Sequence, residues 1–302
     1  MPLKEIMKKP TIDAVAALSN KGLGYRRIAD QLNLSERKVR DMLLEVKKRH
    51  ISNETMAIMG DPHADPKEPN DRFTWAGKFL RDRQPKRLVC AGDFPDLDSL
   101  NSFEKGKKSM EGKRYRLDVD CVIDAQEKLL TPIADLDIEL DMVGGNHDHR
   151  IIRACNELAH LDGTIGLKDL KFEEFGWNYH KYGKVVTIEG IAFTHHFTSG
   201  RMDRPIGGVN QAQTILQVKK MNSVQGHSHV LDYKQGTRGN GEPIFALVAG
   251  CYFQKEVHYV TRSEQDNWWP GIVLATPYIN DSGFKAWDME FVSLERIKSK
   301  YS

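Results

Sequence analysis

Five short motifs carry side chains that bind metal ions. They are Gly60-Asp-Pro-His63, Gly92-Asp-Phe-Pro-Asp96, Gly144-Gly-Asn-His-Asp148, His195-His196 and Gly226-His-Ser-His229. Carboxylate, imidazole and amide groups suit manganese, iron or zinc better than calcium. A single Asp can bridge two cations, and two cations about 3.5–4 Å apart can hold the attacking and leaving oxygens of a phosphoryl transfer. The residue types therefore indicate chemistry on a phosphate ester at a pair of metal ions.

Each motif follows or ends a short apolar run of the kind that forms a strand. The runs are Thr55–Met59, Arg87–Ala91, Glu139–Val143, Ile191–His195 and Ser223–Gln225. In an open α/β sheet the carboxyl ends of the strands line a common crevice, so we expect the five loops to meet there.

The pattern between the motifs predicts helices and further strands. Helices are expected over Asp71–Arg83, Leu117–Leu136 and Gln211–Met221, with Pro132 kinking or ending the second. Lys184–Glu189 should form a hairpin with the run after Gly190, and Ile244–Ala249 should be a strand. This alternation predicts an α/β layered domain.

In this order the motifs resemble the calcineurin-like metallophosphoesterase family, from Met59 to about Val230. The resemblance implies a β-sandwich flanked by helices, phosphate-ester hydrolysis and two divalent ions. Mn²⁺ is the first choice, with Fe, Zn, Ni or Mg as alternatives. The implied ligands of the first ion are Asp61, His63, Asp93 and His229. Those of the second are Asp93, Asn146, His195 and His227, so that Asp93 bridges.

The resemblance also implies a catalytic pair. His147 would face the substrate and steady the transition state or protonate the leaving oxygen, while Asp96 would orient it. Two departures matter. His195 is followed by His196 where the family often has Gly; we prefer His195 as the ligand, and His196 then contacts substrate or caps the strand end. Leu97 stands where the family's protein phosphatases carry Arg, which argues mildly against that branch.

Residues 1–50 form a basic segment with 12 Lys/Arg and six Asp/Glu, whereas the remainder carries 32 and 36. Apolar spacing predicts three helices, with Thr11 and Ser35 as N-caps of the first and third. Gly22 to Arg49 resembles a helix-turn-helix domain. The resemblance and the charge suggest that Arg37, Lys38 and Arg40 contact DNA; the alternative is protein contact or dimerisation.

A second basic stretch, residues 101–116, follows the second motif and is expected to overhang the metal crevice. Its candidate substrate-binding residues are Lys105, Lys107, Lys108 and Arg114, and Arg201 after the fourth motif would join the same rim. The alternative is a solvated loop. Trp268 and Trp269 offer either a stacking face for bases or ordinary packing.

Length and composition set the remaining expectations. The 302 residues accommodate a small all-α domain over 1–50 and a catalytic α/β domain over 51–302. No apolar run reaches the roughly 18 residues of a membrane span, and no signal peptide is evident, so we expect a cytoplasmic protein. Four cysteines without a CxxC pair indicate reduced thiols.

Three functions remain open at this point. The leading hypothesis is a phosphodiester hydrolase, a nuclease acting on DNA, of a type that bacteriophages encode. The alternative is a small-nucleotide phosphodiesterase, a phosphomonoesterase or a phosphoprotein phosphatase whose N-terminal domain binds protein. The third is a non-enzymatic regulator, which the intact metal set disfavours. The pattern says nothing about oligomeric state.

Overall fold

The computed structural model describes residues 12–51, 54–254 and 265–302. The chain separates into two compact units. The first comprises residues 1–54 with 276–288, and the second comprises residues 55–275 with 289–302. None of the described helices is long and apolar enough to cross a bilayer.

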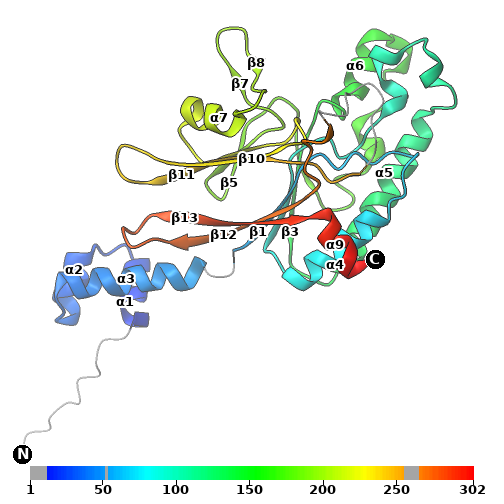
Figure 1. Ribbon diagram of the computed structural model, residues 1–302. Helices are drawn as coiled ribbons and strands as arrows, with labels where there is room; N and C mark the ends of the chain where they lie inside the picture. Colours follow the sequence, from blue (N-terminus) through cyan, green and yellow to red (C-terminus); the bar gives the residue numbers. More distant parts are fainter. Residues whose placement is uncertain (1–11, 52–53, 255–264) are drawn as a thin grey trace, which may run out of the picture. The chain divides into compact units, whose positions relative to one another are not determined.

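The first unit contains the three expected helices (Figure 1): α1 (Ile12–Asn20), α2 (Tyr25–Leu32) and α3 (Glu36–Ile51). Val15, Ile28 and Val39, one from each helix, are fully buried together. The Oγ of Ser35 accepts a hydrogen bond from the Lys38 amide at 3.2 Å, which confirms the predicted N-cap of α3. Thr11, the other predicted cap, lies outside the described residues.

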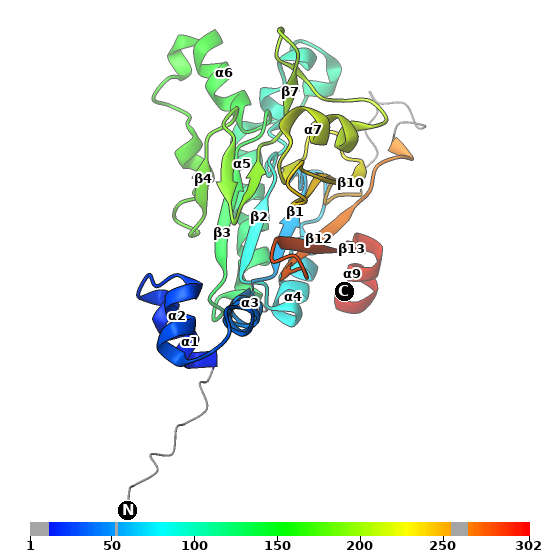
Figure 2. The same cartoon turned by 90° about the vertical axis from the view of Figure 1, so that its left-hand side faces the viewer.

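A six-stranded sheet has the order β13-β12-β1-β2-β3-β4. Its strands are β1 (Met56–Met59), β2 (Arg87–Cys90), β3 (Glu139–Val143), β4 (Asn178–His180), β12 (Gly271–Ile279) and β13 (Lys285–Ser293). β1 to β4 are parallel, as Figure 2 shows, and β12 runs antiparallel to β1. All four residues of β1 are buried, which is expected where both faces of a parallel sheet are covered.

A second sheet has the order β10-β11-β9-β6-β5. Its strands are β5 (Val186–Ile188), β6 (Ile191–Phe193), β9 (Ser223–Gln225), β10 (Leu231–Thr237) and β11 (Pro243–Ala249). The predicted hairpin around Gly190 is confirmed by the antiparallel pair β5–β6. β10 was not predicted, because its sequence has little apolar alternation; pairing along β11 holds it as an edge strand. β7 (Thr198–Ser199) and β8 (Arg204–Pro205) form a separate ribbon.

Helices cover the sheets. α4 (Asp71–Arg83), α5 (Tyr115–Leu130) and α9 (Leu294–Tyr301) pack on the six-stranded sheet, and α7 (Gln211–Lys219) packs on the five-stranded one (Figure 1). α6 (His149–Glu157) follows β3. α5 ends two residues before Pro132, so proline ends this helix rather than kinking it. α9 was not predicted.

Short 3₁₀ turns occupy the connections: Asp98–Leu100, Ser102–Glu104, Lys108–Met110, Thr131–Ile133, Ala159–Leu161 and Leu167–Leu170. The expected fold class is confirmed. Two sheets flanked by helices follow a small group of helices, and buried apolar side chains such as Leu88, Phe73 and Leu129 fill the space between sheet and helices.

Candidate metal centre

The loops that carry the five motifs leave the ends of β1, β2 and β3 in one sheet and of β6 and β9 in the other. Their backbone is unusual, because five of their non-glycine residues have positive φ. These are Asp61 (33°), His63 (44°), Asp93 (49°), His227 (73°) and His229 (62°). Left-handed backbone at such residues costs on the order of 1–3 kcal/mol and clusters at functional sites. The loops are thus bent in a way that aims these side chains inward.

Glycine makes the close approach possible at two points. A Cβ on Gly145 would collide with the carboxylate of Asp93, and one on Gly92 would collide with the imidazole of His195. Gly92 also has a φ of +112°, which other residues rarely adopt. These two glycines of the motifs therefore serve the packing of the site itself.

One group of donor atoms surrounds the amide oxygen of Asn146. Asn146 Oδ1 lies 2.9 Å from His195 Nε2 and 2.9 Å from His227 Nδ1. His195 Nε2 is also 3.2 Å from Asp93 Oδ2. Its other nitrogen, Nδ1, lies 3.1 Å from the Ala91 carbonyl, to which it donates, so Nε2 is the nitrogen that can bind a cation once it has lost its hydrogen. Four ligand-type side chains therefore converge on one point.

A second group lies on the other side of Asp93. His63 Nε2 is 3.2 Å from His229 Nε2 and 3.9 Å from Asp93 Oδ2. His229 Nε2 is 3.9 Å from Asp61 Oδ2. Asp61 is completely buried, and neither of its carboxylate oxygens has a hydrogen-bond partner among the described residues. Burying a carboxylate without a donor is costly, and a cation would relieve that cost. The donor set fits two divalent cations with Asp93 between them.

The electrostatics agree with this arrangement. Burial and the neighbouring His147 lower the pKa of His63 to about 4, and burial and His195 lower that of His227 to about 4. Burial and His63 hold the pKa of His229 well below its ordinary value. These three imidazoles are neutral at pH 7, which is the form that binds metals.

The carboxyl groups of Asp61 and Asp93 have pKa values shifted in opposite directions. Burial raises the pKa of Asp61 well above its ordinary range. Burial also acts to raise the pKa of Asp93, but His195 and His147 outweigh it and hold that pKa well below its usual range. Burial acts to lower the pKa of His195, whereas the Asp93 carboxylate raises it to about 9.

His147 and Asp96, the predicted catalytic pair, are in direct contact. His147 Nδ1 lies 2.8 Å from the Asp96 carbonyl and 3.0 Å from its Oδ1. His147 Nε2 lies 3.8 Å from Asp93 Oδ2, at the edge of the metal group. Arg150, which the sequence did not single out, places its NH2 3.0 Å from His147 Nε2. No motif pointed to Arg150; only its position three residues after His147, in the first turn of α6, brings it there.

His196 lies beside the second group. Its ring centroid is 5.0 Å from that of His227, and together with His195 and His227 it forms a cluster whose ligand atoms lie within 4.8 Å of one another. His196 Nδ1 is buried and has no hydrogen-bond partner among the described residues. Both histidines of the fourth motif therefore reach the site, and only His195 also contacts Asn146.

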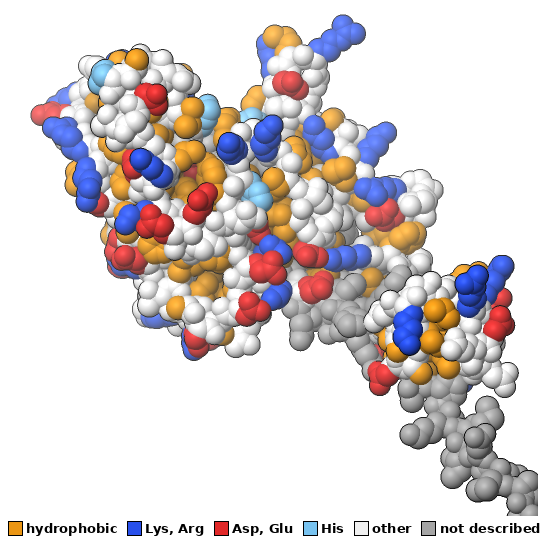
Figure 3. Space-filling view, turned by 180° about the vertical axis from the view of Figure 1, so that it is seen from behind, with side chains coloured by type: hydrophobic (Ala, Val, Ile, Leu, Met, Phe, Trp, Pro, Cys, Tyr) orange, Lys and Arg blue, Asp and Glu red, His pale blue; other side chains and the backbone are white. Residues whose placement is uncertain are grey.

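The predicted substrate-binding cations lie on the surface. Lys105, Lys107, Lys108 and Arg114 are exposed, and Arg201 is exposed in the turn between β7 and β8. Lys107 pairs with Glu104 at 2.8 Å, and Arg114 donates to the Lys113 carbonyl. The contacts described for these side chains thus stay within their own loop. On the face shown in Figure 3, basic and acidic side chains are interspersed.

The predicted DNA-binding residues are exposed on α3: Arg37, Lys38 and Arg40. The guanidinium of Arg40 lies over the Tyr25 ring at 4.2 Å and pairs with Glu36 at 3.6 Å.

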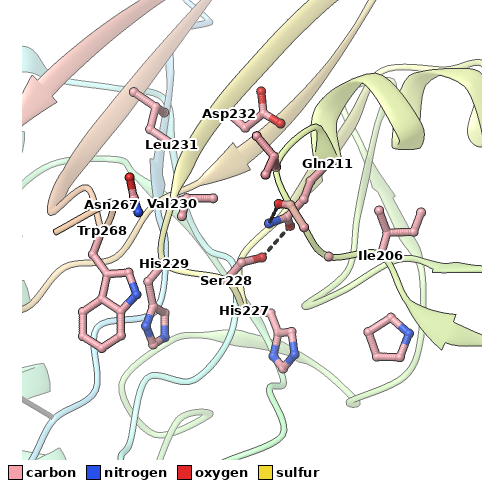
Figure 4. A pocket seen from close by; sticks show the side chains of 14 residues that line it. Ile206, Gln211, His227, Ser228, His229, Val230, Leu231, Asp232, Asn267 and Trp268 are labelled. Atoms are coloured by element: carbon pink, nitrogen blue, oxygen red, sulfur yellow. Dashed lines mark hydrogen bonds between the residues drawn. The ribbon is translucent and has the colours of Figure 1, made fainter. Parts of the chain in front are cut away.

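A pocket of about 740 Å³ adjoins the metal group (Figure 4). His227, His229 and Trp268 line it, together with apolar side chains such as Val230 and Ile206. The Trp268 ring stands perpendicular to His229 at 4.7 Å. Gln211 Oε1 accepts from Ser228 Oγ and from Gln225 Nε2, so the polar wall is internally bonded. The pocket suits an uncharged group more than a second phosphate.

No protein-family model and no curated protein matches the sequence. Solved structures with a similar chain path include a dimetal phosphatase from Danio rerio, at 11% identity and a TM-score of 0.41, covering 80% of this chain and 97% of that one. Chaetomium thermophilum Vps29 is similar at 11% identity and a TM-score of 0.32, covering 79% of this chain and 98% of that one. Pseudomonas putida nuclease MPE is similar at 12% identity and a TM-score of 0.34, covering 75% of this chain and 90% of that one.

Proposed function

We propose that this protein is a two-metal phosphodiester hydrolase of the calcineurin-like type, a nuclease acting on DNA. One observation carries the proposal. Asp93 Oδ2 lies within 3.2 Å of His195 Nε2 and 3.9 Å of His63 Nε2, between two donor groups drawn from both sheets. Asp61 in one of these groups is completely buried, and a cation beside it would relieve the cost of ionising its carboxyl group.

The ligand assignment is part of the proposal. Asp61, His63, Asp93 and His229 hold one ion, and Asp93, Asn146, His195 and His227 hold the other. When bound, such a pair supplies Lewis acidity that polarises a phosphoryl oxygen and lowers the pKa of water. The chain's residues set the geometry: Asp96 fixes the His147 ring through Nδ1, so that Nε2 stays at the rim of the site. Manganese is the proposed metal.

The proposed DNA substrate is supported by charge. Residues 1–50 carry a net charge of +6, and we propose that they form a helix-turn-helix domain separate from the catalytic domain over 51–302. Exposed Arg37, Lys38 and Arg40 would meet phosphates, and Lys105, Lys107, Lys108, Arg114 and Arg201 would extend the contact. We also propose that the protein is cytoplasmic, which its four free cysteines support.

A second candidate is favoured by the pocket of about 740 Å³ beside His227 and His229. Its volume and its mixed polar and apolar lining, which includes no Lys or Arg among the described residues, match a small organic group rather than a polymer backbone. In this alternative the protein is a small-nucleotide phosphodiesterase or a phosphomonoesterase, and the N-terminal helices bind protein.

The deciding experiment uses the manganese-loaded full chain and the Asp93→Ala variant. Two substrates are compared: a labelled DNA duplex with a single-stranded tail, and bis-p-nitrophenyl phosphate. Cleavage of both, lost in the variant, supports the nuclease. Cleavage of the small diester alone supports the small-nucleotide phosphodiesterase of the second candidate, and cleavage of neither refutes phosphodiester hydrolysis.

DNA binding is tested separately with the triple variant Arg37→Ala, Lys38→Ala, Arg40→Ala. We expect its binding to decrease and its dependence on salt to become shallower, because each lost phosphate contact removes released counterions. Unchanged salt dependence would assign these residues no role on DNA.

A further inference from the structure

Arg150 is a buried cation aimed at the catalytic pair. Only 7% of its surface is exposed, although it belongs to the residue type that most often stays in solvent. Its NH1 donates to the Asp96 carbonyl at 2.9 Å, and its NH2 lies 3.0 Å from His147 Nε2. One guanidinium therefore contacts both members of the predicted catalytic pair.

The hydrogen-bond directions around His147 follow from its partners. Nδ1 faces two acceptors, the carbonyl and the carboxylate of Asp96, so it carries the hydrogen. Nε2 faces Arg150, which can only donate, so Nε2 is an acceptor here. Beside His147 Nε2, the hydrogen-bond donor is therefore the guanidinium of Arg150 and not the imidazole of His147.

The charge of Arg150 is only partly balanced. Its nearest carboxylate contact among the described ion pairs is Asp96 Oδ1 at 4.0 Å. Its bonds run to the carbonyls of Asp96 and Leu97 and to His147, and a guanidinium has more N–H donors than these contacts use. Planar guanidinium groups match phosphate oxygens, often in a bidentate manner.

Arg72 shows what a structural arginine in this protein looks like. It is also 7% exposed, but every hydrogen bond described for it ends on a backbone carbonyl, including those of Pro62, His63 and Tyr252. No described contact of Arg72 reaches a catalytic side chain. The two buried arginines therefore provide a matched pair, one built into the loops and one facing the reactive group.

We propose that Arg150 contacts the substrate, donating to a non-bridging oxygen of the phosphoryl group beside His147. This rests on the proposed phosphoesterase function and names a further residue of the same site. In this arrangement His147 positions the guanidinium through Nε2, and Asp96 positions both.

The test compares Arg150→Lys and Arg150→Ala with Arg72→Lys and with Arg153→Lys, a half-buried arginine on the same helix that pairs with Glu157. Binding of inorganic phosphate to the manganese-loaded proteins is measured by calorimetry, and bound manganese is measured for each. We expect Arg150→Ala to weaken phosphate binding about tenfold to a hundredfold at unchanged metal content, because a charge-assisted hydrogen bond is lost. Arg150→Lys should restore part of the affinity. Arg153→Lys should match the parent.

Kinetics with bis-p-nitrophenyl phosphate give the second readout. Arg150→Ala should raise KM and lower kcat, and added guanidinium should restore part of the rate. Arg72→Lys should lower thermal stability, because Arg72 bonds the backbone of the loop that carries His63. Phosphate affinity in Arg150→Ala equal to that of the parent, or a parent that binds no phosphate, overturns the proposal. A parent that binds phosphate through Arg150 but hydrolyses no ester would refute the proposed function alone.

Discussion

Nε2 of His63 and Nε2 of His229 lie 3.2 Å apart, although 166 positions separate the two residues in the chain. Burial lowers the pKa of both imidazoles, so both are neutral at pH 7. Two neutral rings can share only one hydrogen between facing nitrogens, whereas a cation between them accepts both lone pairs. Left-handed backbone at both residues shows that the loops hold this contact against local preference.

Each of the two ligand groups beside Asp93 should hold one metal ion. His229→Ala should remove one ion and His227→Ala the other, because each histidine belongs to one group only. Asp93→Ala should remove both. Bound metal per chain, measured by mass spectrometry after gel filtration, checks this. Retention of both ions in Asp93→Ala would contradict the bridging role.

Metal binding should release protons. In the metal-free protein Asp93 raises the pKa of His195 to about 9, so its imidazole is protonated at pH 7.5. Binding at Nε2 requires the neutral ring, and about one proton per His195 should leave. Calorimetry with Mn²⁺ in HEPES and Tris, whose ionisation enthalpies differ, measures the number. In His195→Asn the number of released protons should fall by about one, while the proton from the buried Asp61 carboxyl is still released; equal release in both proteins would rule out His195 as a source.

Gly145→Ala should disable the site. Its Cβ would collide with the Asp93 carboxylate, which cannot move without leaving His195. We expect loss of metal binding and a decrease in stability of about 1–3 kcal/mol, the usual cost of overpacking. Gly239→Ala is the control, because nothing lies within 4 Å of the added methyl group. Urea unfolding and metal analysis of both variants distinguish them, and normal metal content in Gly145→Ala would disprove the crowding.

Asp118 should make stability depend on pH. Burial raises its pKa from 3.8 to about 6, although the Ser99 amide donates to it at 3.1 Å. The stabilisation from its protonated form is full below pH 3.8 and is lost as pH rises through about 6. The shift corresponds to about 3 kcal/mol.

Asp118→Asn keeps an acceptor for Ser99 and removes the charge, so its stability relative to the parent should increase between pH 4 and pH 6.5. Urea unfolding of the metal-free proteins across this range measures the difference. Asp120→Asn, on the exposed face of the same helix, is the control and should show a flat difference. A flat difference for Asp118→Asn as well would show that this carboxyl titrates normally.

The local sequence predicted many of the helices and strands. α4 begins and ends where its apolar spacing predicts, Ser35 caps α3, and the hairpin turns at Gly190. β4, β10, β12, α6 and α9 were not predicted. β10 has a weak pattern of its own and exists through pairing with β11, and α9 is held by the burial of Leu294 and Ile297. A weak local pattern thus hides an element such as β10, whose strand conformation depends on its pairing partner.

The sequence by itself determined the donor types of the candidate site and the fact that each motif ends a strand. Tertiary structure decided the rest. It selected Nε2 of His195 and Nδ1 of His227, buried the Asp61 carboxyl beside His195 and turned Arg150 toward His147. These choices depend on burial, on side-chain rotamers and on contacts between residues far apart in the chain. Neighbouring residues in the sequence do not encode them.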